Sequence, residues 1–447
     1  MSVLSPLIFK SISKPTRADV FFGFATSPAL LGVGALGIAC AVQRGGFHPA
    51  AVMLLGLAIF LWVVSLFPNF SQRVGFNSST AGLLSLIIVV QIAWSALTGT
   101  GLSAYLDIPP TIRLSPMIAL LIAIPLSLRR PMIALALAIF AFAFAVITTM
   151  LLTPPPLCDV WMFQQGAARS FVNGFNPYHT IYYSPYEIGS AFYGPGIENS
   201  DGSLNVSFPY PPASLLMVMP GYLLGDVRYA LLGWWLIGAV SLALIGLGKT
   251  DSSKSLDEST ANLGLRICVL VALALLSSPH ALMLVLTGWS ESILIGLVGL
   301  TALCIAKRPS LAWLPLGLLF ASKQYLIVLA PVTLLFLTRP LVMKSLLVAV
   351  VLTLPFLYAD REAFYRSVVD FHFIQPFRID GLTFSSFFDQ TLGLRPLAIL
   401  PIVFVVVVAW MLRRNLSRDA SMWFIGSALT LVVFFACSKQ AFGNYFL

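Results

Sequence analysis

Long apolar stretches recur along almost the whole chain and are separated by short polar or basic segments. A spanning helix needs about 20 mostly apolar residues. The stretches are continuous rather than alternating, which differs from the pattern of an outer-membrane barrel. We therefore predict an all-α polytopic membrane protein with roughly 12–14 transmembrane or re-entrant helices. The apolar segments are 19–42, 50–67, 80–98, 114–128, 131–152, 209–225, 229–247, 264–277, 288–305, 310–322, 323–338, 343–358, 395–412 and 419–437.

Composition and charge agree with this prediction. Of 447 residues, 58% are hydrophobic and 10% are charged, whereas about 25% of residues are charged in soluble domains. The net charge of +9 does not imply nucleic acid, because Lys and Arg collect in cytoplasmic loops of membrane proteins. The basic residues that we expect on the cytoplasmic side are Lys10, Lys14, Arg17, Arg73, Arg129, Arg130, Lys307, Arg308, Arg339, Lys344, Arg413, Arg414 and Arg418.

This orientation places the large outer loops. The loops 153–208 and 359–394 share the non-cytoplasmic face. The parity between 209 and 263 stays open, because the short segment after Pro212 is either a full span or a re-entrant one. An apolar run starts again at 444–447, which is consistent with a further helix.

The loop 153–208 contains the richest pattern. Three prolines at 154–156 stop the preceding helix, because proline cannot continue one. Val160, Phe163, Ala167 and Phe171 then follow at helical spacing and predict an interfacial helix that lies on the membrane.

An acid and several cations are predicted on the same face. Asp159 directly follows a spanning helix, and a carboxylate at an apolar boundary can act as a general base. Basic side chains can hold a phosphate and stabilise it as a leaving group. Aromatic residues suit stacking on sugar rings. This combination suits transfer of a sugar from a lipid phosphate to an acceptor hydroxyl. The basic candidates are Lys323, His372, Arg378 and Lys439.

A resemblance to a known family follows from the order of several short motifs. Asp159, then Gly174-Phe175-Asn176-Pro177-Tyr178, then Phe208-Pro209-Tyr210-Pro211-Pro212 resembles the first outer loop of C-type polytopic glycosyltransferases. The similarity is closest to glycosyltransferase family 87, which includes polyprenyl-phosphate-mannose-dependent mannosyltransferases. Later pieces at 278–279, 288–291 and 323–324 fit too, although Gly288-Trp289 stands where Gly-Gln is expected in many relatives. The similarity covers roughly residues 131–447, which it implies are the glycosyltransferase-like core, and residues 1–130 then resemble N-terminal transmembrane helices added to that core.

The resemblance implies a mechanism and a set of roles. Asp159 is expected to be the catalytic base, and the four basic candidates are expected to bind the donor phosphate. Residues expected to contact the acceptor or the sugar are Tyr178, Tyr210, Trp289 and Glu291. No cofactor and no metal are expected. The expected partners are membrane lipid, a polyprenyl-phosphate sugar and a lipid or glycan acceptor.

Other interpretations of the same residues stay open. Asp159 is also placed to cap a helix. Lys323 and Lys439 are placed to snorkel to the interface, and Lys323 is also placed to pair with Glu291. Arg378 is two residues from Asp380, with which it can pair. The rival function is a transporter or flippase of a lipid-linked saccharide, for which no convincing inverted repeat is found.

Two further groups of residues argue against other kinds of site. Glu187, Glu198 and Asp201 match no defined metal-binding spacing. The five cysteines form no CxxC motif and no Cys/His cluster, so neither a zinc site nor a disulfide framework is expected.

The orientation is testable in intact cells. Arg129 and Arg130 precede the span that leads into the loop 153–208, so this loop is expected on the outer face. A cysteine introduced by Ser200→Cys should react with an impermeant thiol reagent in intact cells. Labelling only after the cytoplasm is opened would reverse the orientation and with it the predicted side of the site.

Overall fold

The computed structural model describes residues 27–43, 46–67, 78–98, 110–190, 192–194, 196–247, 258–278, 280–416, 420 and 422–446. Within these residues the protein is helical, and the β-type pairings are two isolated bridges in the first loop, Tyr183 with Ser203 and Glu198 with Leu204. The all-α prediction is thus confirmed for this part. Lys10, Lys14, Arg17, Arg73 and Arg418 lie outside the described residues.

Three of the described helices are long and apolar enough to cross a membrane. They are α6 (Pro131–Leu152), α9 (Arg228–Ile245) and α15 (Arg339–Ala359). Nine further apolar helices have between 10 and 17 residues. The predicted total of 12–14 membrane helices stays a prediction.

The other helices follow the predicted order along the chain. They are α2 (Ser27–Gln43), α3 (Pro49–Ser65), α4 (Ser78–Thr98), α5 (Pro110–Ser127), α7 (Asp159–Val172), α8 (Pro212–Leu223), α10 (Glu258–Leu276), α11 (Ala281–Leu286), α12 (Glu291–Lys307), α13 (Trp313–Phe320), α14 (Ala330–Phe336), α16 (Arg361–Tyr365), α17 (Phe371–Ile374), α18 (Phe384–Leu392), α19 (Leu400–Asn415) and α20 (Met422–Ala436). Short 3-10 turns are η2 (Pro177–His179), η3 (Pro309–Leu311), η4 (Gln324–Leu329) and η6 (Gly443–Phe446), and η5 (Arg366–Asp370) is a π turn.

Glycines set the close packing in the centre of the bundle. A Cβ on Gly296 of α12 would lie 2.6 Å from the carbonyl oxygen of Trp234 on α9. A Cβ on Gly238 of α9 would lie 2.7 Å from the Ile295 side chain. Small residues allow two helix backbones to approach this closely in membrane proteins. The α9–α12 pair is therefore a rigid support for the loops at its ends.

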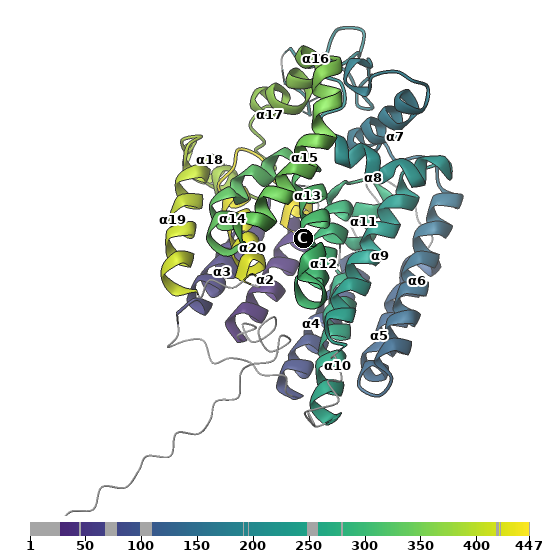
Figure 1. Ribbon diagram of the computed structural model, residues 1–447, viewed down its shortest axis with the longest axis vertical. Helices are drawn as coiled ribbons and strands as arrows, with labels where there is room; N and C mark the ends of the chain where they lie inside the picture. Colours follow the sequence, from purple (N-terminus) through teal and green to yellow (C-terminus); the bar gives the residue numbers. More distant parts are fainter. Residues whose placement is uncertain are drawn as a thin grey trace, which may run out of the picture.

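The two predicted outer loops meet at one end of the molecule. Figure 1 shows α7, α16 and α17 together at the top, beyond the ends of α6 and α15. The Ser207 amide donates to Ser367 Oγ over 3.1 Å, and His179 Nδ1 lies 2.9 Å from Asp360 Oδ2. The loops 153–208 and 359–394 thus form one surface, as predicted. Their side of the membrane stays a prediction.

The N-terminal helices pack against the C-terminal end of the chain. Gln43 at the end of α2 donates to the Asp380 carbonyl over 3.2 Å and accepts from the Gly443 amide over 2.8 Å. A separate cluster of buried residues joins α2 and α3 with α20 and residues 441–446. The predicted segment 1–130 therefore contributes to the same compact bundle, although its status as an addition stays a prediction.

Three predicted spans differ from the helices that form. The segment 209–225 becomes α8 with 12 residues, because Pro211 and Pro212 fix its start. The segments 310–322 and 323–338 are α13, then an extended residue, Lys323, then η4 and α14. The sequence pattern placed a helix boundary at this lysine but did not predict the irregular backbone around it.

Candidate functional site

Asp159 is the first residue of α7. Cys158 occupies the N-cap position and makes no side-chain capping bond, so the prediction that Asp159 itself caps the helix was wrong in position. Asp159 Oδ1 instead accepts from the Val160 amide over 2.8 Å. A carboxylate in the first turn of a helix is favoured by the macrodipole.

Two tyrosine hydroxyls hold the Asp159 carboxylate. Tyr186 donates to Oδ1 over 3.1 Å, and Tyr193 donates to Oδ2 over 3.1 Å. Burial raises the pKa of Asp159 above its ordinary value, and these hydrogen bonds oppose the rise. A carboxylate with a raised pKa is a better general base near neutral pH. Neither tyrosine was among the predicted site residues.

The start of α7 is fixed against the junction of α11 and α12. Gln164 Nε2 donates to the Gly288 carbonyl over 2.5 Å. Gly288 has a φ of 80°, and a Cβ there would lie 2.7 Å from Trp161 Cβ. A glycine is required by both conditions. Trp161 Nε1 also donates to Asp226 Oδ1 over 3.2 Å.

A buried ion pair lies behind this helix. Lys323 Nζ is 3.2 Å from Glu291 Oε1, and both side chains are about 5% exposed. Glu291 Oε2 is buried without a hydrogen-bond partner. The pairing alternative considered for Lys323 is thereby confirmed. A lysine that binds a donor phosphate here must share its charge with Glu291.

Tyr210 and Tyr445 are close to both acidic and basic residues of the site. Lys323 Nζ is 4.4 Å from the centre of the Tyr210 ring, which is a cation–π distance. Burial raises the pKa of Tyr210, with smaller contributions from the charges of Asp159 and Glu291. Burial raises the pKa of Tyr445 as well, with the same two acids contributing, so both tyrosines stay protonated hydroxyl donors.

Arg378 reaches the tyrosine partners of Asp159 through an aromatic contact. Its guanidinium lies 4.9 Å from the centre of the Phe192 ring, and Phe192 stacks on Tyr186 at 4.2 Å. Arg378 also makes a two-point pair with Asp380, at 2.8 Å and 2.6 Å. The pairing considered for Arg378 and Asp380 is confirmed. The other predicted role of Arg378, binding of the donor phosphate, would use the same guanidinium.

His372 and Lys439 contact backbone carbonyls of neighbouring segments. His372 Nε2 lies 3.2 Å from the Pro209 carbonyl and contacts the Gln324 amide. Burial lowers the pKa of His372 to about 4, and the charges of Lys323 and Lys439 add to this effect. His372 is therefore neutral at neutral pH. Lys439 donates to the Phe373 carbonyl over 2.9 Å and the Gln375 carbonyl over 2.6 Å.

The remaining predicted contact residues differ in their surroundings. Tyr178 is fully buried, and its hydroxyl donates to the Tyr210 carbonyl over 2.8 Å. It positions Tyr210 in this conformation and offers no free ring face to a sugar. Trp289 is half-buried at the α11–α12 junction.

The three acids that were considered for a metal stabilise the loop or face solvent. Glu198 accepts from the Gly189 amide over 2.9 Å, and Asp201 accepts from Ser203 over 2.6 Å. Glu187 is exposed. Among the described residues, no group of three or more His, Cys, Asp or Glu side chains is placed to hold a metal ion.

The site combines a proton acceptor, hydroxyl donors and cations within one cluster of loops. Comparisons of the chain with protein-family models, with curated proteins and with solved structures find no match.

The buried pair generates a test of its own. Removing one member of a buried ion pair costs about 3–5 kcal/mol, because the other charge stays buried and unpaired. Lys323→Met should therefore lower the unfolding midpoint in detergent strongly, and the double variant Lys323→Met with Glu291→Gln should recover most of the loss. A snorkelling lysine would instead give a nearly unchanged single variant and no recovery.

The raised pKa of Asp159 generates a pH-dependent test. The folded protein keeps the proton on Asp159 up to a higher pH than the unfolded chain does. The contribution of Asp159 to the free energy of unfolding is therefore full below its ordinary pKa of 3.8 and is lost as the pH rises through the folded pKa. Asp159→Asn cannot titrate and should gain stability relative to the unsubstituted protein across this window. Thermal unfolding in detergent from about pH 4 to about pH 8 measures the difference. A flat difference, or one of opposite sign, contradicts the raised pKa.

Proposed function

We propose that this protein is a multi-pass membrane glycosyltransferase. It would transfer a sugar from a polyprenyl-phosphate donor to a lipid or glycan acceptor on the non-cytoplasmic face. The observation that carries the proposal is the Asp159 carboxylate, which is buried, has a raised pKa and is held by the hydroxyls of Tyr186 and Tyr193.

The proposed reaction is a single displacement. Asp159 accepts the proton of the acceptor hydroxyl, and the acceptor oxygen forms a bond to the anomeric carbon. The bond from that carbon to the phosphate oxygen breaks, and the polyprenyl phosphate leaves with both electrons. Attack from the opposite face inverts the anomeric configuration. Tyr186 and Tyr193 keep the two carboxylate oxygens oriented.

The cations would stabilise the leaving phosphate. Arg378 has the geometry for two-point binding of a phosphate, and Phe192 orients its guanidinium. Lys323 contributes a buried positive charge. His372, being neutral, would act as a hydrogen-bonding group rather than as a charge.

The alternative of a transporter or flippase rests on the buried Glu291–Lys323 pair, because charges at membrane depth also mark transport paths. The two proposals differ in the fate of the donor. A glycosyltransferase releases polyprenyl phosphate and a glycosylated acceptor, whereas a transporter returns the donor intact.

The decisive variant is Asp159→Asn. It keeps the size of the side chain but cannot accept a proton at neutral pH, so turnover should fall about 100- to 10,000-fold. The assay uses purified protein with a panel of polyprenyl-phosphate sugars and follows release of polyprenyl phosphate. Asp159→Glu should be intermediate, because the carboxylate is kept but displaced.

Asp201→Asn is the matched control for this variant. Asp201 is an exposed acid of the same loop, and asparagine keeps the oxygen that accepts from Ser203. Its turnover should be unchanged. Near-normal turnover in Asp159→Asn, in a protein that unfolds normally, removes Asp159 from the mechanism. If the unsubstituted protein releases polyprenyl phosphate from none of the donors in the panel, the proposed activity is contradicted.

A further inference from the structure

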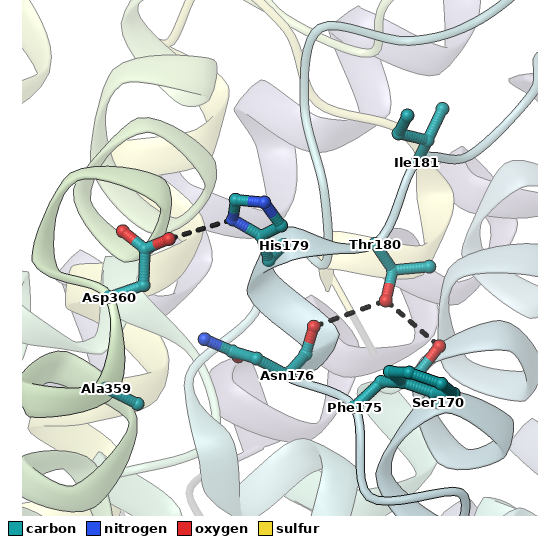
Figure 2. A pocket seen from close by; sticks show the side chains of 8 residues that line it. All are labelled: Ser170, Phe175, Asn176, His179, Thr180, Ile181, Ala359 and Asp360. Carbon is teal, nitrogen blue, oxygen red and sulfur yellow. Dashed lines mark hydrogen bonds and ion pairs between the residues drawn. The ribbon is translucent and has the colours of Figure 1, made fainter.

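A groove of about 570 Å³ lies at the end of α7 that is remote from Asp159. It opens between the last turn of α7, the segment 175–181 and the start of α16 (Figure 2). Ser170 lines it, 11 residues after Asp159, which corresponds to about 16 Å along a helix. The groove is therefore a different place from the cluster around the catalytic candidate.

The contact between His179 and Asp360 forms one wall of the groove. His179 Nδ1 is 2.9 Å from Asp360 Oδ2, and the other oxygen of Asp360 accepts from the Ala363 amide over 2.9 Å. These bonds, with the Ala363 amide first, lower the pKa of Asp360, so it is ionised at neutral pH. Both of its oxygens are occupied. The second ring nitrogen of His179 stays open, because the side chain is 77% exposed.

The opposite wall offers uncharged hydrogen-bonding groups. Asn176 Oδ1 accepts from the Tyr178 amide over 3.0 Å, and its NH₂ group points into the open space beside Ala359 (Figure 2). Thr180 Oγ1 lies 3.2 Å from the Asn176 carbonyl oxygen, to which it donates, and 3.0 Å from Ser170 Oγ (Figure 2). The groove thus presents amide, hydroxyl and imidazole groups.

An aromatic ring lies at the edge of these polar groups. Phe175 is 69% exposed and lies next to Ser170 (Figure 2). A flat apolar ring beside amide and hydroxyl groups suits a ligand with both a C–H face and hydroxyls, which describes a sugar ring.

The charge of the groove argues against an anionic ligand. None of the residues that line it is Lys or Arg, and Asp360 contributes a negative charge. A phosphate or an anionic lipid headgroup would be repelled by this carboxylate. A neutral ligand has no such cost.

We propose that this groove binds a neutral saccharide unit of the glycan acceptor, at a point remote from the hydroxyl that receives the new sugar. The proposal rests on the proposed function for the identity of the acceptor. An acceptor glycan of several sugars would extend along α7 from Asp159 to Ser170. Its remote unit would stack on Phe175 and bind Asn176 and His179.

Binding can be measured without turnover. The probes are linear tetrasaccharides of mannose, glucose, galactose and arabinose, added to the full protein in detergent and followed by saturation-transfer NMR and calorimetry. At least one should bind. Phe175→Ala should weaken that binding about three- to tenfold, which is the range of an aromatic contact. Asn176→Asp keeps the bond from the Tyr178 amide, loses the NH₂ donor and should weaken binding too.

Phe373→Ala is the matched control, because Phe373 is 80% exposed and does not line the groove. It should leave binding unchanged. Absence of binding for all four tetrasaccharides, or binding that neither groove variant weakens, overturns the proposal. A response to inorganic phosphate or to phosphatidylglycerol vesicles that Phe175→Ala removes overturns it as well, in favour of a headgroup site.

The test of saccharide binding in the groove can fail or succeed independently of the test of sugar transfer. Asp159→Asn should keep saccharide binding while it loses turnover. Binding in the groove by a protein that never consumes a polyprenyl-phosphate donor would contradict the glycosyltransferase proposal alone.

Discussion

The buried pair of Glu291 and Lys323 is the interaction on which the candidate site depends. Two opposite charges that are about 5% exposed are tolerated only when they satisfy each other. Glu291 begins α12, and Lys323 is the extended residue directly before η4. The pair therefore joins two places where helices begin or break. Irregular backbone of this kind is tolerated at membrane depth only where protein groups satisfy it.

The same break sets the position of the loop that carries Asp159. Gln324, next to Lys323, donates to the Pro209 carbonyl over 3.2 Å. The Lys323 charge lies over the Tyr210 ring, and Tyr178 holds the Tyr210 carbonyl from the other side. Loop residues 209–210 are thus held between the ion pair and the aromatic core. Asp159 keeps its orientation through Tyr186, Tyr193 and the Val160 amide.

Sequence patterns predicted the parts of this arrangement that arise from local chemistry. The periodicity of α6 and α15, the helix that starts at residue 159 and the convergence of two polar loops all follow from apolar spacing and proline positions. The partners of Asp159 do not, because 27 and 34 residues separate it from Tyr186 and Tyr193. Tyr178 was predicted at the sugar and lies in the core, since a Tyr-rich pattern does not tell which ring is covered.

Under the proposed function, the two cations differ in the free energy needed to engage a phosphate. Arg378 pairs with Asp380, whose side chain is 32% exposed, so water can solvate this carboxylate when a phosphate takes its place at the guanidinium. Lys323 pairs in a dry site, where leaving Glu291 alone costs about 3–5 kcal/mol. A donor phosphate is therefore expected to recruit Arg378 first. Lys323 would act through its field while it remains paired, which explains why the chain keeps a costly charge where an apolar side chain would pack as well.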